Sequence, residues 1–332
     1  MLEHGGRLRA AAARYGIPLE SWLDLSTGLN PLGWPVPNPP PEAWARLPEE
    51  EDGLECAAAD YYGCRTLLPV AGTQAAIQAL PLLRPPSRVA VLQPTYAEHD
   101  HAWRRGGHEV CPIAAEAVTE GPGALACDVL VLVNPNNPTG HRFSREVLMA
   151  WLQALAERGG WLVVDEAYMD PTPERSLANL CPRPGLILLR SVGKFFGLAG
   201  IRVGFVFAET PLLERLANLL GPWTVAGPSR WVAAQVLSDR DWQAQARRRV
   251  QRESERLAAL LRSVDLPPAG GCALYHWRPT PDAATLHADL ARHGILTRLF
   301  SEPAGLRFGL PGDEASWRRL QDALANAAVV AP

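Results

Sequence analysis

The most informative chemical feature of the sequence is one lysine with two phosphate-type ligands at fixed spacing. Lys194 follows Ser191 by three residues and precedes Arg202 by eight. A lysine amine can hold an aldehyde cofactor as a Schiff base, a hydroxyl can donate to a phosphate oxygen, and a guanidinium can bind a phosphate bidentately. The spacing therefore predicts a covalently held, phosphorylated cofactor, with an ordinary loop lysine as the alternative.

Polar groups also follow three other apolar runs. Asp165 ends one run, the string N-P-N-N-P-T-G occupies residues 134–140, and Tyr96 comes shortly after residues 89–92. A carboxylate at the end of a buried strand can bind a protonated nitrogen of a ligand. Each group also has a simpler explanation: a helix cap for Asp165, turn chemistry for residues 134–140 and core packing for Tyr96.

Two further positions could bind anions. Gly72 and Thr73 open a helical segment, where free amides and the positive helix end favour an anion, although an ordinary N-cap has the same composition. Arg307 stands in the otherwise apolar run 306–309. Its planar guanidinium is suited to a substrate carboxylate.

The elements that must position these residues alternate between short apolar runs and helical patterns. The runs cover residues 89–92, 129–133, 161–164, 186–189 and 203–207. Such continuous runs are typical of parallel strands buried on both faces. A helix over 144–158 lies between two of them, with Ser144 as its N-cap. The pattern predicts a doubly wound α/β domain that binds its ligand at the carboxyl ends of the strands.

We expect three regions: an N-terminal arm and proline-rich loop over 1–44, a large domain over 45–228 and a small C-terminal α/β domain over 229–332. The arm holds a helix over 8–15, an extended stretch over 22–26 and six prolines within 31–41. The C-terminal pattern predicts a long helix over 229–262, strands over 273–277, 295–299 and 306–309, and helices over 283–293 and 314–327.

The motifs S-x-x-K-x7-R, D-x-A-Y at 165–168 and N-P-x-N-P-T-G at 134–140 together resemble those of the pyridoxal-phosphate (PLP) enzymes of aminotransferase fold type I, the class I and II aminotransferase-like family. The resemblance implies PLP as the cofactor and Lys194, Asp165 and Tyr168 as catalytic residues. It also implies the full set of cofactor-binding residues: Gly72, Thr73, Gln74, Tyr96, Asn137, Asp165, Tyr168, Ser191, Lys194 and Arg202.

The resemblance assigns each residue a contact. Residues 72–74 would bind the cofactor phosphate together with Ser191 and Arg202. Tyr96 would stack on the pyridine ring, while Asn137 and Tyr168 would donate to the phenolate oxygen.

One stretch departs from the family pattern. Many relatives contribute a tyrosine from the neighbouring subunit to the cofactor phosphate, in an Arg-Tyr-Pro string, whereas this chain has Arg46-Leu47-Pro48. Either that contact is lost or Tyr61 or Tyr62 supplies it. The resemblance also implies a homodimer, in which the proline-rich loop and the Leu47 region would cross between subunits.

Two subfamilies compete for the reaction, and the N-terminal arm separates them. The tripeptide His4-Gly5-Gly6 and the string D-x-S-x-x-x-N-P-L-G at 24–33 look like the arm of the threonine-phosphate decarboxylases of cobalamin synthesis. The subfamily's substrate contacts map by position onto His4, Gly5, Gly28, Asn137, Arg298 and Arg307. Relatives can carry asparagine at the place of Gly28, so here only a backbone contact remains.

The resemblance therefore implies decarboxylation of L-threonine O-3-phosphate to (R)-1-aminopropan-2-ol O-2-phosphate. A histidinol-phosphate aminotransferase is the alternative, and a non-enzymatic PLP-binding sensor is a remote one. Such a sensor would carry a DNA-binding domain ahead of the aminotransferase-like region, for which an arm of about forty proline-rich residues is too short.

Composition argues against several other classes of protein. The 332 residues carry a formal net charge of -3, and the basic run 247–249 lies among glutamates in a helical pattern, so we expect no nucleic-acid partner. No apolar run reaches the length of a membrane span. The six cysteines form no C-x-x-C pair, so we expect reduced thiols and no metal site. The chain is expected to be a cytoplasmic enzyme acting on a small phosphorylated amino acid.

Overall fold

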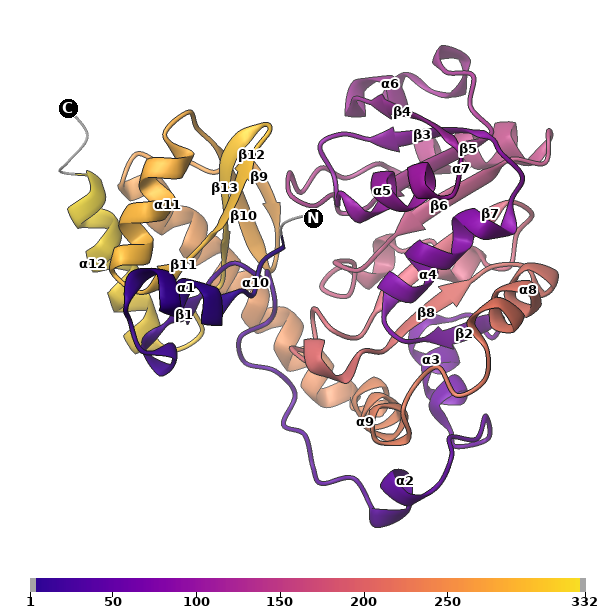
Figure 1. The fold of residues 1–332 in the computed structure, drawn as a ribbon, viewed down its shortest axis with the longest axis horizontal. Helices are drawn as coiled ribbons and strands as arrows, with labels where there is room; N and C mark the ends of the chain where they lie inside the picture. The colour runs from indigo at the N-terminus through magenta and orange to yellow at the C-terminus, as the bar shows by residue number, and fades with distance from the viewer. Residues whose placement is uncertain (1–3, 329–332) are drawn as a thin grey trace. The chain divides into compact units, whose positions relative to one another are not determined.

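The computed structural model describes residues 4–328, and the chain forms two compact units (Figure 1). Unit 1 contains the residues up to Gly33, residues 138–140 and those from Ala246 onward. Unit 2 contains residues 34–137 and 141–245. The units thus divide the chain at residues 33 and 245, whereas the sequence suggested domain limits at 44 and 228.

A seven-stranded sheet forms the centre of unit 2, as far as the structure describes it, in the order β2-β8-β7-β6-β5-β3-β4. Parallel pairing joins β3 to β4 and β5, β5 to β6, and β6 to β7, while β8 is antiparallel to both its neighbours. The prediction of a doubly wound, mostly parallel sheet is confirmed. The strands are β2 Leu67–Val70, β3 Arg88–Leu92, β4 Glu109–Ile113, β5 Val129–Val133, β6 Trp161–Asp165, β7 Leu186–Ser191 and β8 Gly204–Phe207.

Helices cover the sheet of unit 2 on both faces. Alternate strand residues, among them Val131 and Val163, pack in one apolar core with residues of α4, α5 and α8. The residues between them, such as Leu130 and Leu162, are also fully buried, because successive side chains point to opposite faces. The helices are α2 Pro41–Ala45, α3 Leu54–Tyr62, α4 Thr73–Ala79, α5 Glu98–Arg105, α6 Ala115–Glu120, α7 Arg145–Ala156, α8 Thr210–Leu220 and α9 Gly227–Ser238.

Unit 1 joins the arm to the C-terminal residues. Strand β1 pairs in parallel with β11, and Trp22 packs with Ala291 and Leu296. A second, antiparallel sheet has the order β12-β13-β10-β9. Helix α10 begins in unit 2 and continues into unit 1. The elements of unit 1 are α1 Leu8–Tyr15, β1 Leu23–Asp24, α10 Arg240–Ser263, β9 Gly270–Cys272, β10 Tyr275–Pro279, α11 Ala283–Arg292, β11 Ile295–Leu296, β12 Arg298–Ser301, β13 Ala304–Gly309 and α12 Glu314–Ala328.

Three predicted elements are wrong in their limits. The helix expected over 229–262 is two helices, α9 and α10, because Asp239 leaves the helical conformation and its carboxylate accepts the backbone N–H of Trp242 as a cap. The strand expected over 295–299 is split at Thr297 into β11 and β12, which belong to different sheets. The strand expected over 273–277 begins only at Tyr275, after the turn that joins β9 to β10.

Short 3₁₀ turns connect several elements: Leu19–Ser21, Leu80–Leu83, Pro122–Ala124, Pro173–Arg175, Ala178–Leu180 and Ala199–Ile201. Across residues 4–328, every helix is too short or too polar to cross a membrane.

Candidate active site

The predicted cofactor residues meet at one cavity of unit 2, at the carboxyl ends of the parallel strands. Strand β6 ends at Asp165 and β7 at Ser191, so both side chains reach the same edge of the sheet. The cavity has a volume of ≈ 130 Å³. Its lining contains every predicted cofactor residue except Gly72, together with two apolar neighbours: Thr73, Gln74, Tyr96, Val133, Asn137, Asp165, Ala167, Tyr168, Ser191, Lys194 and Arg202.

Lys194 faces the ring of Tyr168 across this cavity. Its Nζ atom lies 5.5 Å from the centre of that ring. The next two residues, Phe195 and Phe196, are fully buried, and the Phe196 carbonyl accepts the backbone N–H of Trp34 at 2.9 Å. The backbone behind the lysine is therefore anchored, while its amine remains at the cavity.

Ser191, Thr73 and Arg202 form a cluster of anion-binding groups on the cavity wall. Gly72 lies directly against Arg202 with a φ of +71°, and a Cβ atom added there would lie 2.5 Å from Nη2 of that guanidinium. The left-handed φ favours glycine here, and the absence of a side chain leaves room for the guanidinium. A hydroxyl pair and a guanidinium at one place fit the phosphate group of a cofactor.

Asp165 is a buried residue of the cavity wall, and both of its carboxylate oxygens have partners. Oδ1 accepts the backbone N–H of Ala167 at 2.9 Å, and Oδ2 lies 3.1 Å from Nε2 of His99. An ionised carboxylate can only accept, so the paired Nε2 carries the hydrogen. Sequence patterns did not indicate His99 as a site residue. Its position three residues after Tyr96, in the first turn of the helix that follows, is the signal that could have found it.

Tyr96 contributes an aromatic wall. Burial raises the pKa of its phenol, and the negative charges of Glu98 and Asp165 raise it further, so the hydroxyl stays protonated.

The loop after β5 has three asparagines, of which two make hydrogen bonds within the fold and one lines the cavity. Asn134 accepts the backbone N–H of Phe143 at 3.1 Å. Asn136 accepts the Thr95 hydroxyl at 2.7 Å and donates to the Pro94 carbonyl at 2.9 Å. Asn137 lines the cavity instead. Two of the three amides thus shape the loop that presents the third.

Comparison with known proteins agrees with this geometry. The model of the family "aminotransferase class I and II" matches residues 47–324. The chain belongs to this family.

Two relatives of this aminotransferase family match nearly the whole chain. A threonine-phosphate decarboxylase of Pseudomonas aeruginosa is 59% identical over 324 residues, which cover 98% of this chain and 97% of that protein. A threonine-phosphate decarboxylase of a Sinorhizobium species is 44% identical over 97% of both chains. The resemblance inferred from the motifs is confirmed.

A solved structure shows the same aminotransferase fold. The histidinol-phosphate aminotransferase of Sinorhizobium meliloti, in complex with pyridoxal-5'-phosphate, superposes with a TM-score of 0.79 at 20% identity and covers 99% of this chain and 95% of that one. At that identity the likeness establishes the fold alone, and the fold type I prediction is confirmed.

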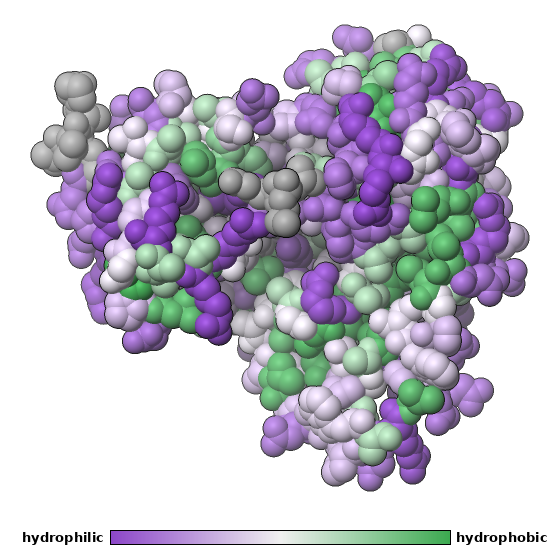
Figure 2. Space-filling view, in the orientation of Figure 1, coloured by the Kyte–Doolittle hydropathy of each residue, from purple (hydrophilic) through white to green (hydrophobic). Residues whose placement is uncertain are grey.

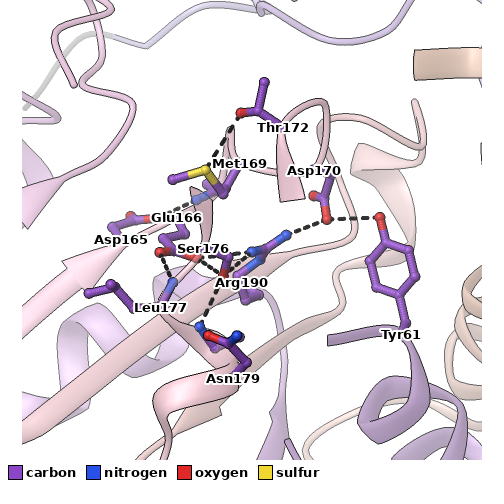
Figure 3. A network of polar contacts seen from close by, with 12 residues as sticks. Tyr61, Asp165, Glu166, Met169, Asp170, Thr172, Ser176, Leu177, Asn179 and Arg190 are labelled. Carbon is purple, nitrogen blue, oxygen red and sulfur yellow. Dashed lines mark hydrogen bonds and ion pairs between the residues drawn. The ribbon is translucent and has the colours of Figure 1, made fainter. Parts of the chain in front are cut away.

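A buried ionic network lies next to the cavity (Figure 3). Arg190 forms two ion pairs. Its Nη1 atom donates to Glu166 Oε2 at 2.9 Å, and its Nη2 atom donates to Asp170 Oδ1 at 2.5 Å. The Ser176 hydroxyl donates to Glu166 at 2.5 Å, and the Tyr61 hydroxyl donates to Asp170 at 3.1 Å. The network ties the turn after β6, which carries Tyr168, to β7 and α3.

Burial and charge oppose each other in this network. Burial raises the pKa of Glu166, although Arg190 pulls it down. Burial alone would lower the pKa of Arg190, but Asp170 and Glu166 raise it above its ordinary value, so the guanidinium stays charged. Burial also raises the pKa of Tyr62, whose ring lies 4.7 Å from the Arg190 guanidinium. Tyr61 and Tyr62, the two candidates for a phosphate-binding tyrosine, thus both contact this network within the chain.

Several predicted substrate-binding residues belong to the N-terminal arm or to the C-terminal strands. They lie near Ser26 in unit 1. Arg307 donates from Nη2 to the Ser26 carbonyl at 2.6 Å, and Arg298 is its cross-strand partner. The backbone N–H of Gly6 donates to the Ser26 hydroxyl at 2.7 Å. A Cβ atom on Gly5 would lie 2.4 Å from the Ser26 carbonyl oxygen, so this close approach requires glycine.

The remaining candidates lie in the same arm. His4 is half-buried, and Gly28 has a φ of +62°, a conformation that glycine adopts readily. Ser26 itself was not among the predicted site residues, although it contacts two of them, Gly5 and Arg307, and stands within the D-x-S motif. The Ser26 side chain in turn donates to Asp24 Oδ1 at 2.6 Å, which explains that spacing.

Proposed function

We propose that the protein is a PLP-dependent carboxy-lyase that converts L-threonine O-3-phosphate into (R)-1-aminopropan-2-ol O-2-phosphate and CO₂, a step of cobalamin synthesis. The 59% identity to a threonine-phosphate decarboxylase across 98% of the chain carries this proposal, because it includes the arm as well as the cofactor cavity. The fold alone would not select this reaction, since histidinol-phosphate aminotransferases share it.

The cavity residues fit PLP group by group. Lys194 offers an amine for the aldehyde, and Asp165 offers a carboxylate for the pyridine nitrogen. Ser191, Thr73 and Arg202 offer donors for the phosphate. When bound, PLP supplies a sink for the electron pair left at Cα as the carboxylate leaves.

The chain's own residues then have distinct tasks. With PLP bound, Asp165, held by His99, would keep the pyridine nitrogen protonated, and Asn137 and Tyr168 would donate to the phenolate oxygen. Lys194 would supply the proton that Cα takes up once CO₂ has left.

Orientation of the substrate decides which bond breaks. A decarboxylase must hold its substrate so that the Cα–carboxylate bond is the one that breaks, whereas an aminotransferase must hold it so that the Cα–H bond breaks. We assign this orientation to groups that grip the substrate's phosphate and carboxylate, namely His4, Gly5, Gly28, Asn137, Arg298 and Arg307.

We further propose that the enzyme is a cytoplasmic homodimer. Unit 2 exposes large apolar side chains beside α2 and α9: Trp44, Leu47 and Trp223 are 69%, 63% and 59% exposed. Gly227 packs against the backbone of Ala43, so the two helices present one continuous surface. Green and white surface surrounds this region among purple hydrophilic residues in Figure 2. Sedimentation of an active monomer at assay concentration would contradict the dimer.

The reaction is tested with the PLP-loaded enzyme and two substrates. L-Threonine O-3-phosphate should release CO₂ and yield aminopropanol phosphate by mass spectrometry. Histidinol phosphate with 2-oxoglutarate should give little or no glutamate. Robust transamination without CO₂ release would overturn the decarboxylase assignment in favour of the aminotransferase.

Two further measurements locate the chemistry. Borohydride reduction followed by peptide mapping should place the pyridoxyl group on Lys194, and its appearance on another lysine would refute the cofactor assignment. Deletion of residues 1–6 should reduce decarboxylation far more than PLP binding, since the cofactor candidates all lie between Gly72 and Arg202. Equal loss of both would show that the arm has no specific part in substrate binding.

A further inference from the structure

We propose that Glu98 is a positioning residue that holds the Tyr96 ring in place through the side-chain amide of Gln74. The idea rests on the proposed PLP cofactor, because Tyr96 forms one wall of that cavity. The proposal gives a role to Glu98, which belongs to none of the motifs and is not among the predicted site residues.

The contacts form a short relay between α4 and α5. Gln74 Nε2 donates to Glu98 Oε2 at 2.7 Å, and Gln78 Nε2 donates to the same oxygen at 2.9 Å. The Tyr96 hydroxyl donates to Gln74 Oε1 at 3.1 Å. Gln74 and Gln78 stand four residues apart on one face of the helical segment, which lets one carboxylate bind both amides.

Chemistry determines the direction of every hydrogen bond in this relay. An ionised carboxylate only accepts, so both amides must turn their NH₂ groups toward Glu98. The Gln74 carbonyl oxygen then faces Tyr96, and the phenol must donate to it. Burial and the Glu98 charge raise the pKa of Tyr96, so the proton needed for this donation is retained.

The relay limits the movement of the Tyr96 ring. Gln74 holds its hydroxyl end, and the His99 ring meets it edge-on, with centroids 6.1 Å apart and planes at 81°. His99 in turn contacts Asp165. With a neutral residue at position 98, the Gln74 amide could rotate and present NH₂ to the phenol, which would then lose its acceptor.

The simpler explanation is that Glu98 only stabilises the first turn of α5, where acidic side chains favour the helix dipole. Asp100 lies in the same turn and separates the two explanations. Its carboxylate accepts Nε and Nη2 of Arg104 at 2.8 and 3.0 Å on the same helix. Asp100→Asn is therefore a matched control: it removes an equal charge from the same turn without touching the relay.

The test compares Glu98→Gln and Asp100→Asn, each alone and combined with Tyr96→Phe. The readouts are the PLP dissociation constant from titration of apoenzyme and the circular dichroism of the bound cofactor. Glu98→Gln should weaken PLP binding roughly 2- to 10-fold and change the dichroism, whereas Asp100→Asn should leave both nearly unchanged. In the Tyr96→Phe background, Glu98→Gln should have no further effect, because the relay has lost its end point.

Two results would overturn the proposal: equal effects of Glu98→Gln and Asp100→Asn, or additive effects of Glu98→Gln and Tyr96→Phe. If Glu98→Gln does not fold, Glu98→Ala with Tyr96→Phe forms the equivalent cycle, and additivity there counts equally against it. Neither readout uses a substrate, so a failure of the relay is distinct from an error about the reaction. Absence of PLP binding by the unmodified enzyme would instead refute the proposed function.

Discussion

Asp165 and Glu166 are adjacent acidic residues at the end of one strand, and the structure uses them in opposite ways. Asp165 lines the cavity and contacts His99 and one backbone amide. Glu166 lies in the network behind it, where its oxygens receive Arg190, Ser176 and the backbone N–H of Leu177. Both are buried, so burial does not distinguish them.

The difference lies in what each carboxylate has left to bind. Glu166 is surrounded by donors from its own chain and neutralised by a guanidinium, so it stabilises the turn. Asp165 contacts the His99 ring and one backbone amide but still faces a cavity, so it can take a further partner such as a protonated pyridine. A buried acid is therefore a candidate for chemistry when it also reaches a ligand space.

The largest expected effect comes from removing the cation of the network. Arg190→Ala should lower the free energy of unfolding by about 3–5 kcal/mol, because two buried carboxylates lose their counter-charge. Urea denaturation would measure it. A loss below about 1 kcal/mol would mean that the buried carboxylates do not need the Arg190 charge. Glu166 and Asp165 would then not differ in the way described.

Asp165→Asn should show the opposite profile. Turnover should fall about 10- to 150-fold, since a hydrogen bond to a charged group contributes about 1.5–3 kcal/mol, while PLP binding and the free energy of unfolding change little. Steady-state kinetics and denaturation on the same preparation would test both statements. Near-normal turnover would make Asp165 structural, like its neighbour.

His99→Gln should reduce turnover by about 5- to 10-fold, because glutamine can still donate to Asp165 but less rigidly. His108→Gln is the matched control. That histidine is also buried in unit 2, but its Nε2 atom contacts the Pro81 carbonyl, and it does not line the cavity. Equal losses in both variants would show that His99 acts only through folding.

Tyr61→Phe should have the smallest effect. It removes one hydrogen bond to Asp170 and should lower the free energy of unfolding by roughly 0.5–1.5 kcal/mol, with turnover unchanged. A marked loss of PLP affinity would instead indicate that Tyr61 contacts the cofactor phosphate, as one reading of the Arg46-Leu47-Pro48 departure suggests.

Much of the cofactor cavity could be predicted because its residues belong to local motifs. Asp165 and Ser191 end strands whose apolar pattern is evident, and parallel strands must bring such ends to one edge. Gly72 was predicted from a turn, and its φ of +71° is a conformation that favours glycine. Helix limits were less certain: the break at Asp239 depends on a side-chain cap within an otherwise continuous pattern.

The sequence by itself determined the sheet, the order of its motifs and the family, since these follow from apolar periodicity and from spacings of a few residues. Only the tertiary structure decided that His99 holds Asp165 and that Glu166 serves Arg190, because these pairs are 66 and 24 residues apart. It also decided that the arm packs with the C-terminal residues through β1 and β11. Such contacts depend on which elements become neighbours in space, and no local pattern of residue types encodes that choice.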